Sequence, residues 1–117
     1  MLIAATILTA LIGLGCLTGG IAIFSGKAAE WPDVVTSEST LKRVGIGLFI
    51  LSILQWVSVL AVMLVSDYAK LFVLASTAIF QAAGFSGNKI VFGDYRPMHT
   101  GTNSLIVGIV WGLVLLA

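Results

Sequence analysis

The residues best suited to chemistry lie together in the stretch "GDYRPMHTG", residues 93–101 of the 117-residue chain. His99 titrates near neutral pH without a strong perturbation, and Asp94 is close enough in sequence to orient its imidazole. A nucleophilic triad also needs an activated nucleophile, and no local nucleophile motif accompanies this pair. A metal site needs further ligands, but the chain holds one histidine and one cysteine, the distant Cys16. We therefore expect no metal site and no cofactor, and predict that the protein is not an enzyme.

The same stretch suits a connection between two helices. Gly93 permits a positive φ, Asp94 can bond forward to the backbone, and Pro97 disfavours helix in the residue before it. Basic residues beside such a turn can bind the headgroups of anionic lipids. We expect lipid headgroup contacts from Lys89, Arg96 and His99.

The composition decides the solvent that surrounds these residues. Hydrophobic residues make up 59% of the chain and charged residues 9%, whereas about 25% of a typical soluble domain is charged. So few charges cannot cover a water-facing surface, which indicates an integral, multi-pass membrane protein. The net charge of +1 and the lack of a Lys/Arg run argue against a nucleic-acid partner.

Charge-free runs mark the segments that cross the bilayer, because an ionised side chain is costly in hydrocarbon and about 20 helical residues span it. Barrel strands would alternate over about 10 residues, and no run does so. The first run lacks the basic start of a signal peptide, so we interpret it as a retained span. The sequence predicts one all-α domain, residues 1–117, forming an integral membrane four-helix bundle with antiparallel sequential neighbours. The predicted spans are about 2–26, 41–66, 68–88 and 100–117.

Helix starts are predicted from side chains that can accept a hydrogen bond from first-turn amides. Thr36, Ser37 or Thr40 is expected to cap the second helix, Asp67 the third, and Thr100 or Thr102 the fourth.

The orientation follows from the distribution of basic residues between the two ends of the bundle. Four spans place both termini on one side, together with the link between the second and third spans. That link holds only Lys70, whereas the other two links hold Lys27, Lys42, Arg43, Lys89 and Arg96. The positive-inside rule then predicts termini on the non-cytoplasmic side. We expect a bacterial inner membrane or the inner membrane of an organelle.

Two glutamines lie where an amide is costly, in the middle of the bilayer. If the second and third helices turn about Tyr68 and Ala69, equally deep residues have numbers that add up to about 137, which places Gln55 level with Gln81. A direct bond between the two amides would fix the helix register. Alternatively, both amides face an open cavity together with Trp56 and form a polar spot in a ligand site.

Small residues at a spacing of four form ridges that let helix backbones approach closely. One ridge is Ser104, Gly108 and Gly112, and another is Gly15 and Gly19. Either ridge could pack within the bundle or against a partner chain.

One family resemblance rests on layout. Lys42 and Arg43 open the second helix before Gly45 and Gly47, and the third helix ends at "GFSGNK" before a link that contains proline. In these features, and in four helices over about 117 residues, the chain resembles the small DoxX-like membrane proteins. The resemblance implies an accessory role near a membrane oxidoreductase or quinone chemistry, and it carries over no functional residue.

We expect a non-catalytic accessory or structural subunit that packs into a larger membrane complex or a homo-oligomer. The alternative is a binder or facilitator of a small apolar or quinone-like ligand, or of a lipid. A second alternative is a small transporter, since the size resembles the small multidrug resistance transporters. These use a glutamate in the first span, and residues 1–26 contain no acid.

Overall fold

In the computed structural model, residues 2–25, 34–64, 66–93 and 97–117 are described, the side chains of 66 and 97–99 excepted. They form helices α1 (Leu2–Phe24), α2 (Glu38–Leu64), α3 (Ala69–Phe92) and α4 (Pro97–Leu116), with a short 3-10 helix η2 (Ser66–Tyr68) between α2 and α3. Among the described residues there is no strand, which confirms the all-α fold.

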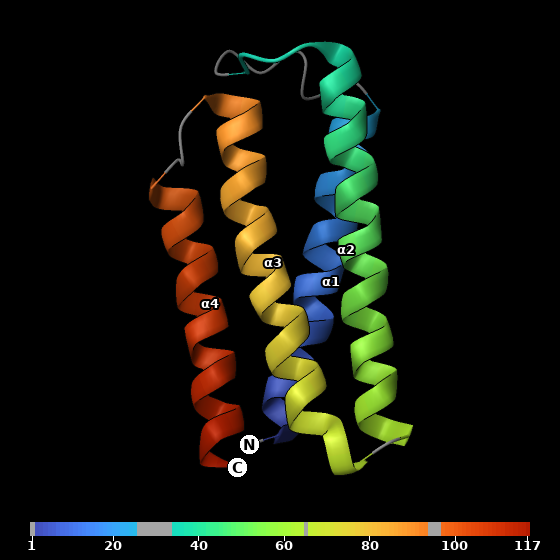
Figure 1. Ribbon diagram of the computed structural model, residues 1–117, viewed down its shortest axis with the longest axis vertical. Helices are drawn as coiled ribbons and strands as arrows, with labels where there is room; N and C mark the ends of the chain where they lie inside the picture. The colour runs from blue at the N-terminus through green and yellow to red at the C-terminus, as the bar shows by residue number, and fades with distance from the viewer. Residues whose placement is uncertain (1, 26–33, 65, 94–96) are drawn as a thin grey trace.

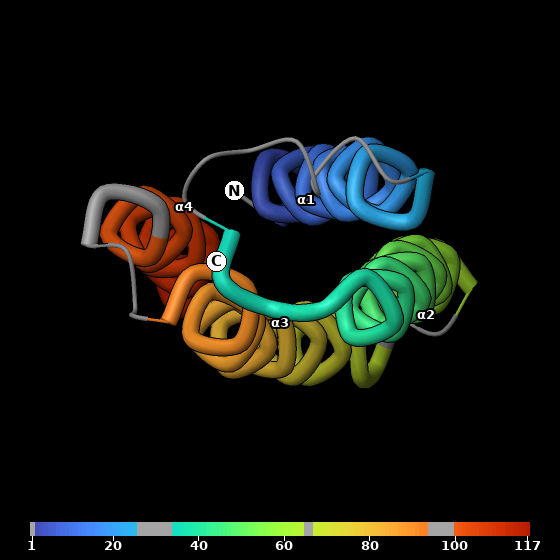
Figure 2. The backbone as a smooth tube through the Cα atoms, turned by 90° about the horizontal axis from the view of Figure 1, so that it is seen from above, coloured from blue at the N-terminus to red at the C-terminus, as the bar shows by residue number. Residues whose placement is uncertain are grey.

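The four helices alternate in direction, so both termini lie at one end of the bundle together with η2 (Figure 1). We call this the terminal end, and the opposite end, where α1 and α3 finish, the link end. Seen along its length, the bundle has α1 beside α2, α2 beside α3, and α3 beside α4 (Figure 2). α4 also contacts α1 and closes the ring.

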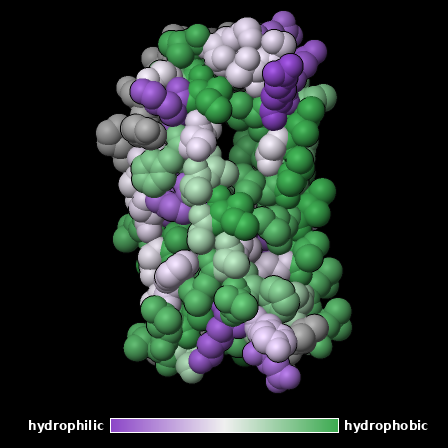
Figure 3. Space-filling model, viewed as in Figure 1, coloured by the Kyte–Doolittle hydropathy of each residue, from purple (hydrophilic) through white to green (hydrophobic). Residues whose placement is uncertain are grey.

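Length and composition fit a membrane-embedded protein. Helices α1, α2 and α3 are each long and apolar enough to cross a bilayer, whereas the apolar part of α4 is the shorter stretch Thr100–Leu116. The bundle is 44 Å long, close to the roughly 40–45 Å of a bilayer with its headgroups. Hydrophobic residues dominate the face seen in Figure 3, and hydrophilic ones gather toward the two ends.

Helix boundaries follow local chemistry. α2 begins at Glu38 because the Ser37 hydroxyl accepts a hydrogen bond from the Thr40 amide at 3.3 Å, which confirms Ser37 as its cap. α3 ends at Phe92 with Gly93 as its C-cap: the Gly93 amide donates to the Lys89 carbonyl at 3.0 Å, and the φ of 79° then turns the chain out of the helix. α4 begins at Pro97, three residues before its predicted start, since proline suits the first turn of a helix. Thr100 and Thr102 therefore lie inside α4.

The link between α2 and α3 differs from its prediction. Ala69 and Lys70 already belong to α3, and Tyr68 precedes the helix without a side-chain cap, so Asp67 does not cap it. With α2 ending at Leu64 and α3 beginning at Ala69, the numbers of equally deep residues add up to about 133 rather than 137. Gln81 therefore lies about one helical turn closer to the link end than Gln55.

Glycines bring α1 and α2 together, but along a different ridge from the predicted one. A Cβ on Gly13 would lie 2.7 Å from Trp56 Nε1, and one on Gly45 would lie 2.9 Å from the Cβ of Phe24. A Cβ added to Gly19 would make only an ordinary contact, 3.7 Å from Leu48 Cδ1, and a Cβ on Gly15 would meet nothing within 4 Å. The close α1/α2 contact is thus formed at Gly13, Gly20 and Gly45.

Candidate functional site

A layer of hydrogen bonds ties the four helices together near mid-depth. Gln55 Nε2 of α2 donates to the Ser76 carbonyl of α3 at 2.9 Å. Trp56 Nε1 of α2 donates to the Ala10 carbonyl of α1 at 3.3 Å, and Trp111 Nε1 of α4 donates to Thr77 Oγ1 of α3 at 2.9 Å. Ser76 Oγ also donates to Ser58 Oγ of α2 at 3.1 Å. We call Gln55, Trp56, Ser58, Ser76, Thr77 and Trp111 the polar layer.

The two glutamine amides do not bond to each other. Gln81 Nε2 donates to the hydroxyl of Ser104 on α4 instead. Gln81 follows Thr77 by four residues, so it lies on the face of α3 that meets α4, and it is also about one turn closer to the link end than Gln55. Each glutamine thus holds α3 to a different neighbour, and the Oε1 atoms of both are buried without a hydrogen-bond partner among the described residues.

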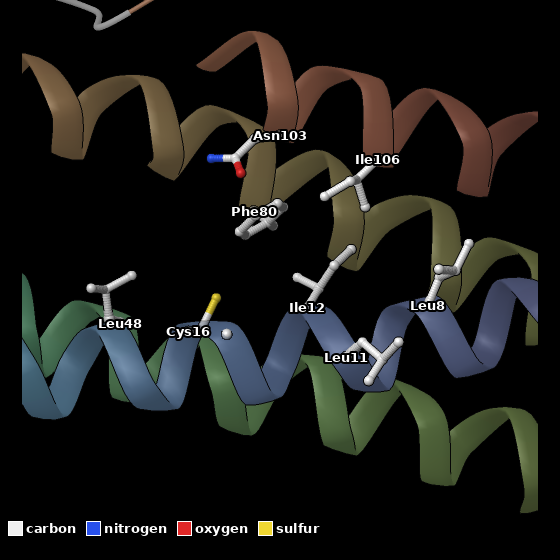
Figure 4. Close-up of a pocket in the computed structure, with 9 residues that line it drawn as sticks. Leu8, Leu11, Ile12, Cys16, Leu48, Phe80, Asn103 and Ile106 are labelled. Carbon is white, nitrogen blue, oxygen red and sulfur yellow. The ribbon is translucent and has the colours of Figure 1, made fainter. Parts of the chain in front are cut away.

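A cleft opens between α1 and α4, beginning at the level of the polar layer and extending toward the link end. Its volume is about 430 Å³, within the range of roughly 300–1,000 Å³ typical of small-molecule sites. The walls are apolar except at Asn103 of α4 and Cys16 of α1, which project into the cleft from opposite sides (Figure 4). The other lining residues are Leu8, Leu11, Ile12, Gly15, Leu48, Phe80 and Ile106.

A second hollow of about 150 Å³ continues from this cleft into the bundle interior. The two share the walls Leu48, Phe80 and Asn103. Gly84 of α3 permits the close approach of Asn103, because a Cβ on Gly84 would lie only 3.3 Å from Asn103 Nδ2. Asn88 also lines this hollow, and its Nδ2 donates to the Gly84 carbonyl at 2.8 Å.

Asn103 is the polar group available to a ligand in the cleft. Its side chain is half-buried and makes no hydrogen bond to any residue that the structure describes. A carboxamide carries two N–H donors and one carbonyl acceptor. Left without partners in an apolar wall it costs free energy, so a ligand carbonyl or hydroxyl would find a matching group here.

The predicted site residues separate into several places. Gln55, Trp56 and Gln81 line none of the three hollows described here, and Gly15 lies in the wall of the α1/α4 cleft. Gly108 and Gly112 have no atom within 4 Å of an added Cβ. Lys89 is exposed in the last turn of α3. Arg96 and the side chain of His99 lie outside the described residues.

Asn103, Phe80 and Cys16 were not predicted as site residues. The signal available for Asn103 was an amide inside an apolar run next to Ser104. In the part of the chain that the structure describes, no three His, Cys, Asp or Glu residues come together as a metal site.

No family model, curated protein or solved structure matches the chain. The DoxX-like resemblance therefore stays a prediction.

Proposed function

We propose that the protein is a non-catalytic membrane-embedded binder of a small apolar ligand that carries a carbonyl or hydroxyl group, as quinones do. The observation that carries this proposal is the Asn103 carboxamide, which has no hydrogen-bond partner among the described residues and lies in the wall of a mostly apolar cleft of about 430 Å³. Leu11, which is 56% exposed, and the exposed Gly15 lie in the same wall. A lipid-soluble ligand would enter on this side, directly from the bilayer.

Binding of decylubiquinone to the purified protein in detergent tests the proposal. We expect saturable binding that Asn103→Leu weakens about tenfold, because a hydrogen bond is lost while the ligand oxygen stays buried. Ser104→Ala is the matched control, since Ser104 is adjacent but pairs with Gln81 and does not line the cleft. The control should bind within about twofold of wild type. The proposal is wrong if binding does not saturate, or if both variants bind alike.

A second function, as a subunit of a larger membrane complex or of a homo-oligomer, is favoured by α4. Gly101, Gly108 and Gly112 of this helix have open space where a side chain would be. Glycine in a helix costs about 0.5–1 kcal/mol relative to alanine, and no close contact within the described bundle accounts for these three. A neighbouring helix packed on this face would account for them. Loss of a native-gel complex in Gly108→Leu is the expected result, and unchanged migration would contradict it.

The proposed orientation, with cytoplasmic links, is supported by Lys42, Arg43 and Lys89 at the link end against Lys70 near the terminal end. Labelling of single cysteines by an impermeant maleimide in intact cells tests it, in a Cys16→Ala background. Tyr68→Cys should be labelled and Ser39→Cys protected, and the reverse pattern would invert the assignment.

A further inference from the structure

A groove lies between α2 and α3 at the link end. It shares only Leu48 with the α1/α4 cleft, and the interior hollow of about 150 Å³ shares walls with both. The groove measures about 380 Å³ and is visible as a hollow between these helices in Figure 3. Its space comes from missing side chains, because added Cβ atoms on Gly47 of α2 and Gly87 of α3 would meet nothing within 4 Å. Ala83 continues this small-residue wall, and Leu51 and Ile90 supply apolar contact.

The groove changes character along its length. Thr40 and Arg43 line it within the first two turns of α2, and Ser86 adds a hydroxyl from α3. Leu51 lies eight residues below Arg43, which is about 12 Å along a helix. A charged and hydroxyl-bearing mouth thus leads into an apolar slot that runs toward the bilayer centre.

Arg43 is available at this mouth. It is exposed and has no ion-pair partner among the residues that the structure describes. Lys42 is adjacent and also exposed, so two cations face one acid, Glu38, in this part of α2. A guanidinium pairs with a phosphate through two parallel hydrogen bonds.

From this arrangement we infer that the α2/α3 groove holds one anionic glycerophospholipid. One acyl chain lies in the slot beside Gly47 and Gly87, and Arg43 pairs with the phosphate. Thr40 and Ser86 supply hydroxyl contacts to the headgroup. The local excess of positive charge selects an anionic lipid over a zwitterionic one. This site differs from the predicted headgroup contacts at Lys89, Arg96 and His99, and it does not depend on the ligand proposed for the α1/α4 cleft.

Native mass spectrometry of the full chain, with palmitoyl-oleoyl phosphatidylglycerol or phosphatidylcholine added to the detergent, tests the inference. Wild type should retain one phosphatidylglycerol, and Arg43→Gln should weaken this retention about tenfold, as expected for a lost charged hydrogen bond. Lys42→Gln is the matched control, because it removes the same charge one residue away without lining the groove. It should change retention by less than about twofold.

A second variant tests the slot separately from the headgroup contact. Gly47→Leu fills the groove while leaving Arg43 in place, and it should abolish phosphatidylglycerol retention, a larger loss than in Arg43→Gln. If it fails to give a monodisperse helical protein, Gly87→Leu fills the same groove from α3. Equal retention of the two lipids by wild type, or equal losses in Arg43→Gln and Lys42→Gln, would overturn the inference.

Discussion

The terminal half of the bundle has a filled interior, whereas the link half contains hollows between its helices. In the terminal half, β-branched residues fill the interior and are fully buried, and the polar layer closes it above. In the link half, Gly15, Gly47, Gly84 and Gly87 border three hollows. Among the described residues, a small cluster around Leu41 and Val91 closes the bundle at the link end.

This difference has a physical reason. Lipid tails are as apolar as leucine, so burial alone does not drive helices together in a membrane. Hydrogen bonds and close packing must do so, and the bonds of the polar layer hold the helices together where the terminal half begins. The helices of the link half can therefore stay further apart, and the hollows between them can hold a bound molecule.

The largest expected effect comes from overfilling the packed region. Gly13→Val would place side-chain atoms within 3 Å of the Trp56 indole and break its bond to Ala10. We expect a loss of about 1–3 kcal/mol in unfolding free energy, the usual cost of overpacking, measured by denaturation in mixed micelles. Gly15→Val, two residues away, should cost less than about 0.5 kcal/mol because its Cβ meets open space. Equal losses would remove the contrast between the two faces of α1.

A smaller effect is expected from the bond between α4 and α3 in the polar layer. A double-mutant cycle of Trp111→Phe and Thr77→Val isolates the contact between Trp111 Nε1 and Thr77 Oγ1. The coupling free energy should be about 0.6 kcal/mol and at most about 1.7 kcal/mol, as for other hydrogen bonds between membrane helices. A coupling of zero would show that the polar layer does not hold α4 in place.

The smallest effect should be a gain in stability in the link half. Gly47→Ala and Gly87→Ala add a methyl group where nothing lies within 4 Å and reduce the freedom of the unfolded chain. Each should raise the unfolding free energy by about 0.4–1 kcal/mol, measured in lipid-free detergent. Destabilisation of both variants would indicate that these glycines are needed for packing.

The four helices were predictable because charge-free runs of about 20 residues have few other structures in a membrane. Ser37 caps α2 and Gly93 adopts a positive φ, as predicted, because both features depend on the residues next to them in the chain. The register of α2 against α3 was not predictable from the sequence. Ser66 to Tyr68 form the short helix η2, so the turn between α2 and α3 is centred earlier in the chain than predicted. Gln81 also lies on the face of α3 that meets α4, where it pairs with Ser104 instead of Gln55.

The candidate site was less predictable than the fold. α1 is apolar on every side, so nothing in its sequence distinguishes the Gly13 face from the Gly15 face. A cleft forms where several helices carry small residues at the same depth, and the sequence alone does not show which residues share a depth. Asn103 is therefore recognisable as a candidate site residue only when the structure places it in the cleft wall.

Comparing Gly15→Leu with Gly108→Leu in two assays, decylubiquinone binding and native-gel assembly, separates the ligand site from the assembly surface. Both glycines have open space for a side chain, but only Gly15 lines the α1/α4 cleft. Ligand binding should be lost in Gly15→Leu and kept in Gly108→Leu, with the opposite pattern for assembly. If Gly15→Leu binds decylubiquinone as tightly as wild type does, the cleft is not the ligand site.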